Sequence, residues 1–368
     1  MREDRIQRLA ERLAQHDLHA LALAPGASLF YLTGLSFHLM ERPVVGIFTA
    51  DGHAGLVLPE LERSRAESSG LPLHVIPYGE EETSRMQAFV EAAKEFDLDG
   101  HAIGILPLEL RAFELSLLER VAPEATFAAA EGLLGGLRVV KDAEEIASLR
   151  RAVQLAEAAM RSTLPLVKIG MTEEELAGEL VVQLLRAGSE TTLPFKPIVA
   201  SGPNSALPHA LPTDRALEPG DLLIIDWGGT VGGYGSDLTR TYAVDRLEEE
   251  LARIHQIVQQ ANAAGRGAVR VGGSCAEVDR AAREVIESAG YGAFFVHRTG
   301  HGIGLEAHEP PYLRADNEEL LQPGMAFTVE PGIYLPQRGG VRVEDNLIVT
   351  ERGSECLSTL PRELTFIG

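Results

Sequence analysis

Two aspartates at the ends of strand-like runs carry the first sign of chemistry in this 368-residue chain. Asp226 closes the run 222–226, Asp237 opens the run 237–244, and the stretch between them is rich in glycine. If a two-residue turn falls at Val231–Gly232, the two carboxylates face each other across a hairpin, with Cβ atoms about 5 Å apart. Such carboxylates repel each other unless a cation lies between them. The apolar residues before Asp226 favour a buried strand end, so we interpret the pair as a cation site instead of two solvated turn acids.

A second pair of acids repeats this arrangement nearer the C-terminus. Glu330 precedes Pro331–Gly332, and Glu344 lies beyond Gly339–Gly340 within the alternating run 341–349. Alternation beside a glycine turn predicts a hairpin. We therefore expect a second hairpin that presents Glu330 and Glu344 together.

His301 is the histidine that accompanies these four acids. It lies among small residues in the segment 299–304, TGHGIG, where a backbone or a substrate can approach it closely. Four carboxylates and one imidazole form an oxygen-rich ligand set with a charge of about −4, which matches two divalent ions that share bridging carboxylates. This set favours manganese or cobalt, with zinc and iron as alternatives. An empty site of this charge should make the domain less stable.

The first part of the chain must support these residues, and it alternates helical and strand-like segments. The expected elements are, in order, a helix over 2–16, a strand over 20–24, a hairpin over 44–58 with its turn at Asp51–Gly52, a strand over 73–78, a helix over 86–96, a strand over 102–105 and a helix over 109–121. This order predicts an α/β domain over residues 1–138.

A second domain is expected over residues 139–368, because Asp142 and Glu145 form a capping box that opens a new amphipathic helix. It contains a weak internal repeat at a lag of 102 residues, which pairs Val167 with Val269, Gly170 with Gly272, Thr172 with Ser274, Glu175 with Glu277 and Gly188 with Gly290. Each copy contains a capping box, a helix and a terminal glycine. The repeat predicts a pseudo-twofold domain with two helix pairs covering one sheet, although common helix punctuation could also produce it.

Composition sets outer limits on function. Apolar residues make up 45% and charged residues 24% of the chain, which is typical of soluble globular domains. The net charge of −21 disfavours nucleic acid and anionic membranes as partners. Cys275 and Cys356 form no CxxC pair, the charged start 1–5 does not resemble a secretory signal, and no run is long enough to span a membrane. We therefore expect a cytoplasmic protein.

Several motifs resemble those of the pita-bread metallopeptidases, peptidase family M24, which include prolidase, aminopeptidase P and methionine aminopeptidase. The matching segments are 201–209 (SGPNSALPH), Asp226 with 235–241 (GSDLTRT), 297–309 (HRTGHGIGLEAHE), 329–334 (VEPGIY) and 340–345 (GVRVED). The resemblance is strong from Val139 onward, and in the first domain it extends only to layout, for instance at 31–34 (YLTG). It implies a creatinase-like α/β domain followed by a pita-bread catalytic domain, an α+β architecture overall.

The resemblance also implies roles for the ligands. Every ligand position has the expected residue type: Asp226, Asp237, His301, Glu330 and Glu344. Asp226 and Glu344 would belong to both metals, Asp237 would complete one side, and His301 with Glu330 would complete the other. Two close ions activate a shared water and stabilise the tetrahedral intermediate, and Glu330 could accept the proton of that water.

Other side chains near the motifs have two interpretations each. By resemblance, His209 and His308 assist proton transfer and polarise the scissile carbonyl, and the alternative is a hydrogen-bonded structural histidine. His297 and Arg342 would either fix a ligand or contact the substrate, and Arg342 could capture a substrate carboxylate. Two aromatic residues are candidates for an apolar proline pocket or for the core: Phe195 and Tyr234.

The function implied is hydrolysis of Xaa-Pro bonds in short peptides, by a homodimer. An Xaa-Pro dipeptidase is slightly favoured, and aminopeptidase P with the same site is the alternative. Methionine aminopeptidases usually lack a leading domain of this kind. A non-catalytic peptide-binding module of the same fold would be expected to have lost ligands, and here the ligand set is intact.

Overall fold

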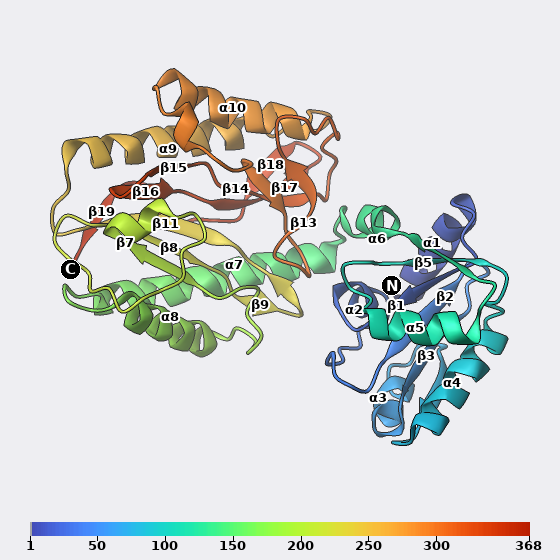
Figure 1. The fold of residues 1–368 in the computed structure, drawn as a ribbon. Helices are drawn as coiled ribbons and strands as arrows, with labels where there is room; N and C mark the ends of the chain where they lie inside the picture. Colours follow the sequence, from blue (N-terminus) through green and yellow to red (C-terminus); the bar gives the residue numbers. More distant parts are fainter. Residues whose placement is uncertain (1) are drawn as a thin grey trace. The chain divides into compact units, whose positions relative to one another are not determined.

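The computed structural model describes residues 2–368, and the chain divides into two compact units, Met1–Arg138 and Val139–Gly368 (Figure 1). Each unit has its own buried apolar interior. Within residues 2–368, no helix is both long enough and apolar enough to cross a bilayer.

The first unit is an α/β domain built on one mixed sheet. Its strands are β1 (Ala20–Leu23), β2 (Val45–Thr49), β3 (Ala54–Pro59), β4 (His74–Tyr78), β5 (Ala102–Ile105) and β6 (Thr126–Ala129), in the spatial order β4-β3-β2-β1-β5-β6. Its helices are α1 (Arg2–Gln15), α2 (Ala27–Thr33), α3 (Arg63–Glu67), α4 (Glu82–Glu95), α5 (Ala112–Val121) and α6 (Glu131–Arg138). Strands β1, β2 and β3 are buried along their whole length, which explains their nearly continuous apolar sequences.

Most of the elements expected in this unit are confirmed. The hairpin β2–β3 turns through Gly52, whose φ of 89° favours glycine. Helix α4 starts earlier than expected, at Glu82, and α5 starts later, at Ala112. The edge strand β6 was not anticipated, because most of its residues are exposed and it therefore lacks an apolar pattern.

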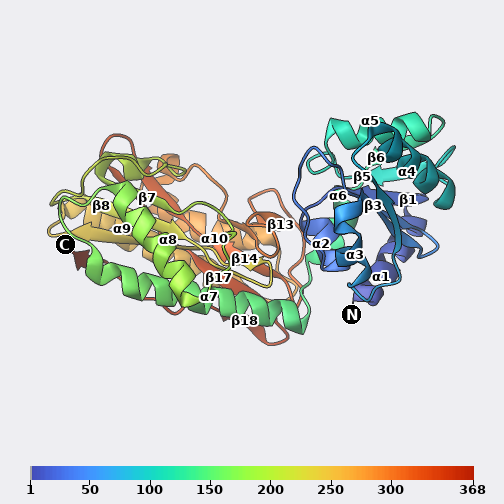
Figure 2. The ribbon, with the colours of Figure 1, turned by 90° about the horizontal axis from the view of Figure 1, so that it is seen from below.

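The second unit places strands between two pairs of helices. The helices are α7 (Ala143–Thr163), α8 (Glu173–Ala187), α9 (Glu249–Ala268) and α10 (Cys275–Ser288). Figure 1 shows α9 and α10 on one side of the strands and α7 and α8 on the other, and Figure 2 shows α7 beside α8. Capping boxes open α7, α8 and α10, and Gly188 and Gly290 have positive φ near the ends of α8 and α10, as the repeat predicts.

Besides two two-stranded sheets, β9 (Thr230–Val231) with β10 (Tyr234–Gly235) and β15 (Gly332–Leu335) with β16 (Gly339–Arg342), the strands of this unit form two larger sheets where a single sheet was expected. One has the order β19-β11-β8-β7 and the other β13-β12-β14-β17-β18. Their members are β7 (Ile198–Ser201), β8 (Leu222–Trp227), β11 (Leu238–Val244), β12 (Gly300–Gly302), β13 (Glu309–Leu313), β14 (Ala326–Val329), β17 (Asp345–Thr350), β18 (Gly353–Cys356) and β19 (Thr365–Ile367). A bridge between Thr239 and Glu344 joins the two, so the division falls at the acidic residues.

Candidate functional site

The hairpin that carries the two aspartates has a different register from the one expected. Strands β8 and β11 pair Asp226 with Thr239, so Asp226 and Asp237 are not directly opposed. The turn lies at Gly232–Gly233, where both residues have positive φ, 59° and 82°. A β-branched residue such as Val231 is strained at positive φ, and this moves the turn one residue along the chain. The resulting shift of two residues keeps both aspartates on the same face of the hairpin.

The two glutamates lie opposite each other at a break between two ladders. The β14–β17 ladder ends with Val329 paired to Asp345, and the ladder of β15 (Gly332–Leu335) with β16 (Gly339–Arg342) begins again after the gap. Glu330 and Glu344 occupy that gap, one on each strand. The second hairpin is therefore confirmed, although its turn precedes Gly339. The Glu344 N–H donates to the Thr239 carbonyl at 3.1 Å, which connects this hairpin to β11.

The ligand atoms of the five candidate residues converge in two overlapping groups. One group is Asp226, Asp237 and Glu344, and the other is His301, Glu330 and Glu344, with the atoms of each group within 4.8 Å of one another. His301 Nε2 lies 3.3 Å from Glu330 Oε1 and 3.6 Å from Asp237 Oδ2. Because Glu344 belongs to both groups, the arrangement suits two cations that share this carboxylate.

The electrostatics of the same residues fit a pair of divalent cations. Burial, followed by the charges of neighbouring acids, raises the pKa of Asp237 and of Glu344 well above the ordinary range. Burial likewise raises the pKa of Glu330 to about 8 and lowers the pKa of His301. Across residues 2–368, the buried atoms Asp226 Oδ1 and Glu344 Oε1 accept no hydrogen bond. Bound cations would satisfy these oxygens and the clustered negative charge together.

The guanidinium group of Arg342 is hydrogen-bonded to neighbouring groups of the protein. It is buried, and its Nη2 lies 2.7 Å from Asp226 Oδ2. Its Nε donates to Thr239 Oγ1 at 3.1 Å, and its Nη1 donates to the Tyr334 hydroxyl at 2.9 Å and to the Pro208 carbonyl at 3.2 Å. These contacts match the interpretation of Arg342 as a residue that fixes a ligand.

The predicted histidines surround one pocket with the candidate ligands. This pocket, of about 890 Å³, is lined by residues that include all five candidate ligands, Arg342, His209, His297 and His308. The rings of His301 and His308 lie 4.0 Å apart between centroids, and burial lowers the pKa of His308. His297 contacts the Tyr334 hydroxyl through Nε2 at 2.9 Å and the Arg298 carbonyl through Nδ1 at 2.7 Å.

The two aromatic candidates have separate positions. Phe195 lines the pocket. Tyr234 belongs to the hydrophobic core, and its hydroxyl donates to Glu145 Oε1 at 2.7 Å. Phe195 is therefore the one of the two that could contact a ligand in the pocket.

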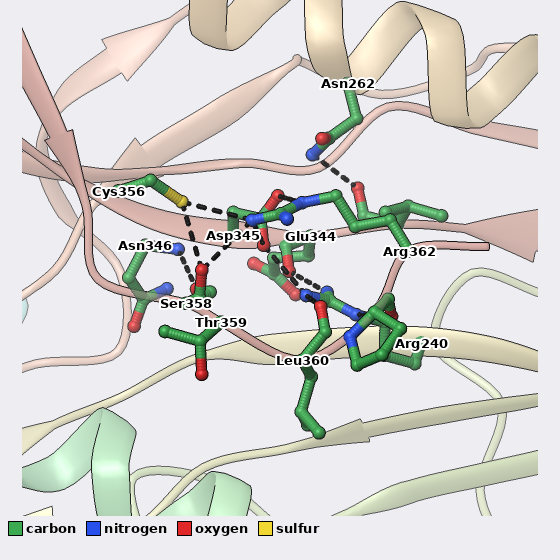
Figure 3. Close-up of polar contacts among 12 residues, drawn as sticks. Arg240, Asn262, Glu344, Asp345, Asn346, Cys356, Ser358, Thr359, Leu360 and Arg362 are labelled. Atoms are coloured by element: carbon green, nitrogen blue, oxygen red, sulfur yellow. Dashed lines mark hydrogen bonds and ion pairs between the residues drawn. The ribbon is translucent and has the colours of Figure 1, made fainter.

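A cluster of three arginines around Asp345, one residue beyond Glu344, was not anticipated. Figure 3 shows two of them, Arg240 and Arg362, beside Asp345. Arg240 Nη2 lies 2.9 Å from Asp345 Oδ1, and Arg362 Nε and Arg266 Nε lie 2.6 and 3.3 Å from Oδ2. Burial favours the neutral acid, but the arginines outweigh it and lower the pKa of Asp345. Arg240 also donates to the Glu344 carbonyl at 2.6 Å. Strand alternation, which places Asp345 and Glu344 on opposite faces, was the available sequence signal.

Comparison with known proteins agrees with this geometry. The model of metallopeptidase family M24 matches residues 147–351, and the model of the creatinase/prolidase N-terminal domain matches residues 5–140. The probable dipeptidase PepE of Mycobacterium tuberculosis is 37% identical over 374 residues, which cover 99% of this chain and 96% of the relative. The Xaa-Pro dipeptidase of Pyrococcus furiosus is 32% identical and covers 98% and 99%. The crystal structure of a dipeptidase from Pyrococcus horikoshii OT3 matches with a TM-score of 0.93, 36% identity and full coverage of both chains.

Proposed function

Since this chain belongs to metallopeptidase family M24 and has a creatinase/prolidase N-terminal domain, we propose that it is an Xaa-Pro dipeptidase, which hydrolyses the bond before proline in dipeptides. The observation that carries the proposal is the pair of ligand groups that overlap at Glu344 inside one pocket. The names of the relatives support a dipeptide substrate, because they include an Xaa-Pro dipeptidase and probable dipeptidases. Aminopeptidase P activity, with a longer substrate in the same site, is the second candidate.

In this proposal Glu344, which belongs to both ligand groups, would hold both ions, Asp237 would complete one site, and His301 with Glu330 would complete the other. Asp226 lies in the group of Asp237, and the family resemblance implies that it too would hold both ions. Manganese is favoured by the oxygen-rich set, with cobalt, zinc and iron as alternatives. When bound, the ions supply Lewis-acid activation of a water and stabilisation of the charge that develops on the scissile carbonyl.

The remaining residues of the pocket transfer protons and orient the substrate or the ligands. Glu330 accepts the proton of the attacking water. His308, whose pKa is lowered by burial, is a neutral imidazole near pH 7 and can donate a hydrogen bond to the substrate carbonyl, while His209 contacts the substrate from elsewhere in the pocket lining. His297 acts through Tyr334 and Arg342, whose chain of hydrogen bonds ends on Asp226.

The same proposal includes a cytosolic homodimer. Cys275 and Cys356 are free thiols, which suits a reducing compartment. The dimer follows from the resemblance to the family, and light scattering of the purified protein tests it.

Elemental analysis and a substrate panel test the catalytic proposal. The purified protein would be assayed on Leu-Pro, Leu-Pro-Pro, Leu-Ala and a methionyl peptide, with and without added manganese. We expect about two metal ions per chain and manganese-dependent cleavage that is fastest on Leu-Pro. A strong preference for Leu-Pro-Pro would replace dipeptidase by aminopeptidase P. Equal rates on Leu-Ala would remove the proline requirement, and absence of both metal and cleavage would favour a binding module.

A further inference from the structure

The buried carboxamide of Asn346 holds both backbone groups of Asp237. Asn346 is 2% exposed and lies on β17, two residues beyond Glu344. Its Oδ1 accepts a hydrogen bond from the Asp237 N–H at 3.1 Å, and its Nδ2 donates to the Asp237 carbonyl. Arg342, Glu344 and Asn346 are alternate residues of the chain. Arg342 binds the Asp226 carboxylate and Glu344 belongs to both ligand groups. Asn346 holds the Asp237 backbone.

A second buried carboxamide, Asn262, holds the two strands that carry the glutamates. Asn262 is fully buried and points from helix α9 toward the strands (Figure 3). Its Nδ2 donates to the carbonyls of Val329 at 3.0 Å and Val343 at 3.2 Å, the residues that directly precede Glu330 and Glu344. The strand ladder is interrupted at the two glutamates, so one amide group links the strands across that gap.

Both carboxamides act where the ligands have the strongest reason to move apart. Clustered buried carboxylates repel one another, and a backbone free to relax would separate them before a cation arrives. Hydrogen bonds to buried backbone groups resist that movement, since breaking them leaves polar groups unsatisfied. A ligand set held in this way loses less conformational entropy when the metal binds.

We propose that Asn346 and Asn262 are positioning residues for the metal centre, which set metal affinity by holding the backbones of Asp237, Glu330 and Glu344. The inference rests on the proposed function, because it requires that these acids bind metal. Neither asparagine contacts the substrate in this account. Their effect is therefore expected in the dissociation constant of the metal, before any effect on the chemistry of hydrolysis.

The test is manganese titration of chelator-treated protein by isothermal calorimetry, for wild type, Asn346→Ala and Asn262→Ala. Each substitution should weaken manganese binding by about 10- to 100-fold, the usual effect of removing a group that orients a ligand. Asn317→Ala is the matched control, because the Asn317 Nδ2 donates to the Tyr312 carbonyl at 2.7 Å and its Oδ1 accepts from the Glu319 N–H at 3.1 Å, a comparable pair of bonds outside the ligand set. The control should keep the wild-type affinity.

Thermal unfolding with and without manganese separates positioning from general stability. A purely structural loss lowers the stability of both forms equally, whereas a positioning loss narrows the gap between them. If an alanine variant does not fold, Asn346→Leu keeps the side-chain volume while removing both hydrogen bonds. Folded variants that bind manganese like wild type would overturn this inference and leave the metal centre standing. A wild-type protein that binds no manganese or other divalent ion would overturn both.

Discussion

Glu344 and Asp345 are neighbours in the chain, are both buried, and yet have opposite electrostatic surroundings. Glu344 faces other acids, and with burial these raise its pKa well above the ordinary range. Asp345 faces three guanidinium groups, from Arg240, Arg266 and Arg362, which lower its pKa in spite of burial. One carboxylate has its counter-ions within the protein, whereas the proposed function assigns metal ions to the other. The difference distinguishes a buried acid that stabilises the fold from one that the fold holds for a ligand.

The two regions are also mechanically connected. Arg240 donates to Asp345 Oδ1 through Nη2 and to the Glu344 carbonyl through Nη1 (Figure 3). The ion cluster around Asp345 therefore anchors the backbone of Glu344, which belongs to the cluster of acids. This arrangement lets a set of repelling acids remain ordered, because the fixed ion cluster lies one residue away.

The largest expected effect comes from Asp237→Asn, which removes one negative charge from the candidate metal centre and preserves the shape of the side chain. Activity on Leu-Pro should fall at least about a thousandfold, since catalytic metal contributes several kcal/mol to transition-state stabilisation. Metal content should fall as well. In chelator, the variant should be at least as stable as wild type, because the substitution relieves repulsion. Kinetics, elemental analysis and urea unfolding check these outcomes, and normal metal stoichiometry would show that Asp237 is not a ligand.

The same chemical change at Asp345 should have the opposite effect on stability. Asp345→Asn leaves three arginines without their shared buried counter-ion, and the free energy of unfolding should fall by about 3 kcal/mol. Urea unfolding in chelator measures it beside Asp237→Asn, which serves as the matched Asp-to-Asn control. Equal losses of stability in the two variants would mean that the two regions do not differ as described.

Two of the candidate ligands could be found from the sequence because they lie beside glycine or proline residues that mark a turn or a close approach. Glu330 precedes Pro331–Gly332, and His301 lies between two glycines. The register of the first hairpin could not be found in the same way. Val231–Gly232 and Gly232–Gly233 are both plausible turns in the sequence, and the strain of valine at positive φ decides between them.

The residues that hold the ligands could not be predicted from the sequence, for a different reason. Arg240 and Asp345 are 105 positions apart, and Asn262 lies 67 and 81 positions from the two residues it binds. Along α9, Asn262 occupies a buried position within an otherwise amphipathic pattern, and local pattern names no partner for it. Such contacts follow from tertiary packing, so they become visible only when the two hairpins have been placed against α9.

His255 shows a third way to bury a titratable side chain, because it is buried in its neutral form. Its substitution has the smallest of the expected effects. It is a buried histidine of α9, and burial lowers its pKa to about 4, while the charges of Glu363 and Arg240 act with opposite signs. The folded-state pKa lies below the unfolded value of about 6.5. The unfolded chain therefore binds the extra proton first, and the contribution of His255 to stability is complete above about pH 6.5 and is lost as the pH falls toward 4.

The contribution of His255 can be isolated with His255→Gln, which removes the titration. Between pH 7 and pH 5, wild type should lose about 2 kcal/mol more of its unfolding free energy than the variant does. Urea unfolding at both pH values with saturating manganese measures this difference, because the acids and the metal are then common to both proteins. Parallel pH profiles would show that His255 becomes protonated without cost inside the fold. In that case the unit Val139–Gly368 would stabilise its buried titratable groups only by ion pairs within the protein, as at Asp345, and by the proposed metal binding, as at Glu344.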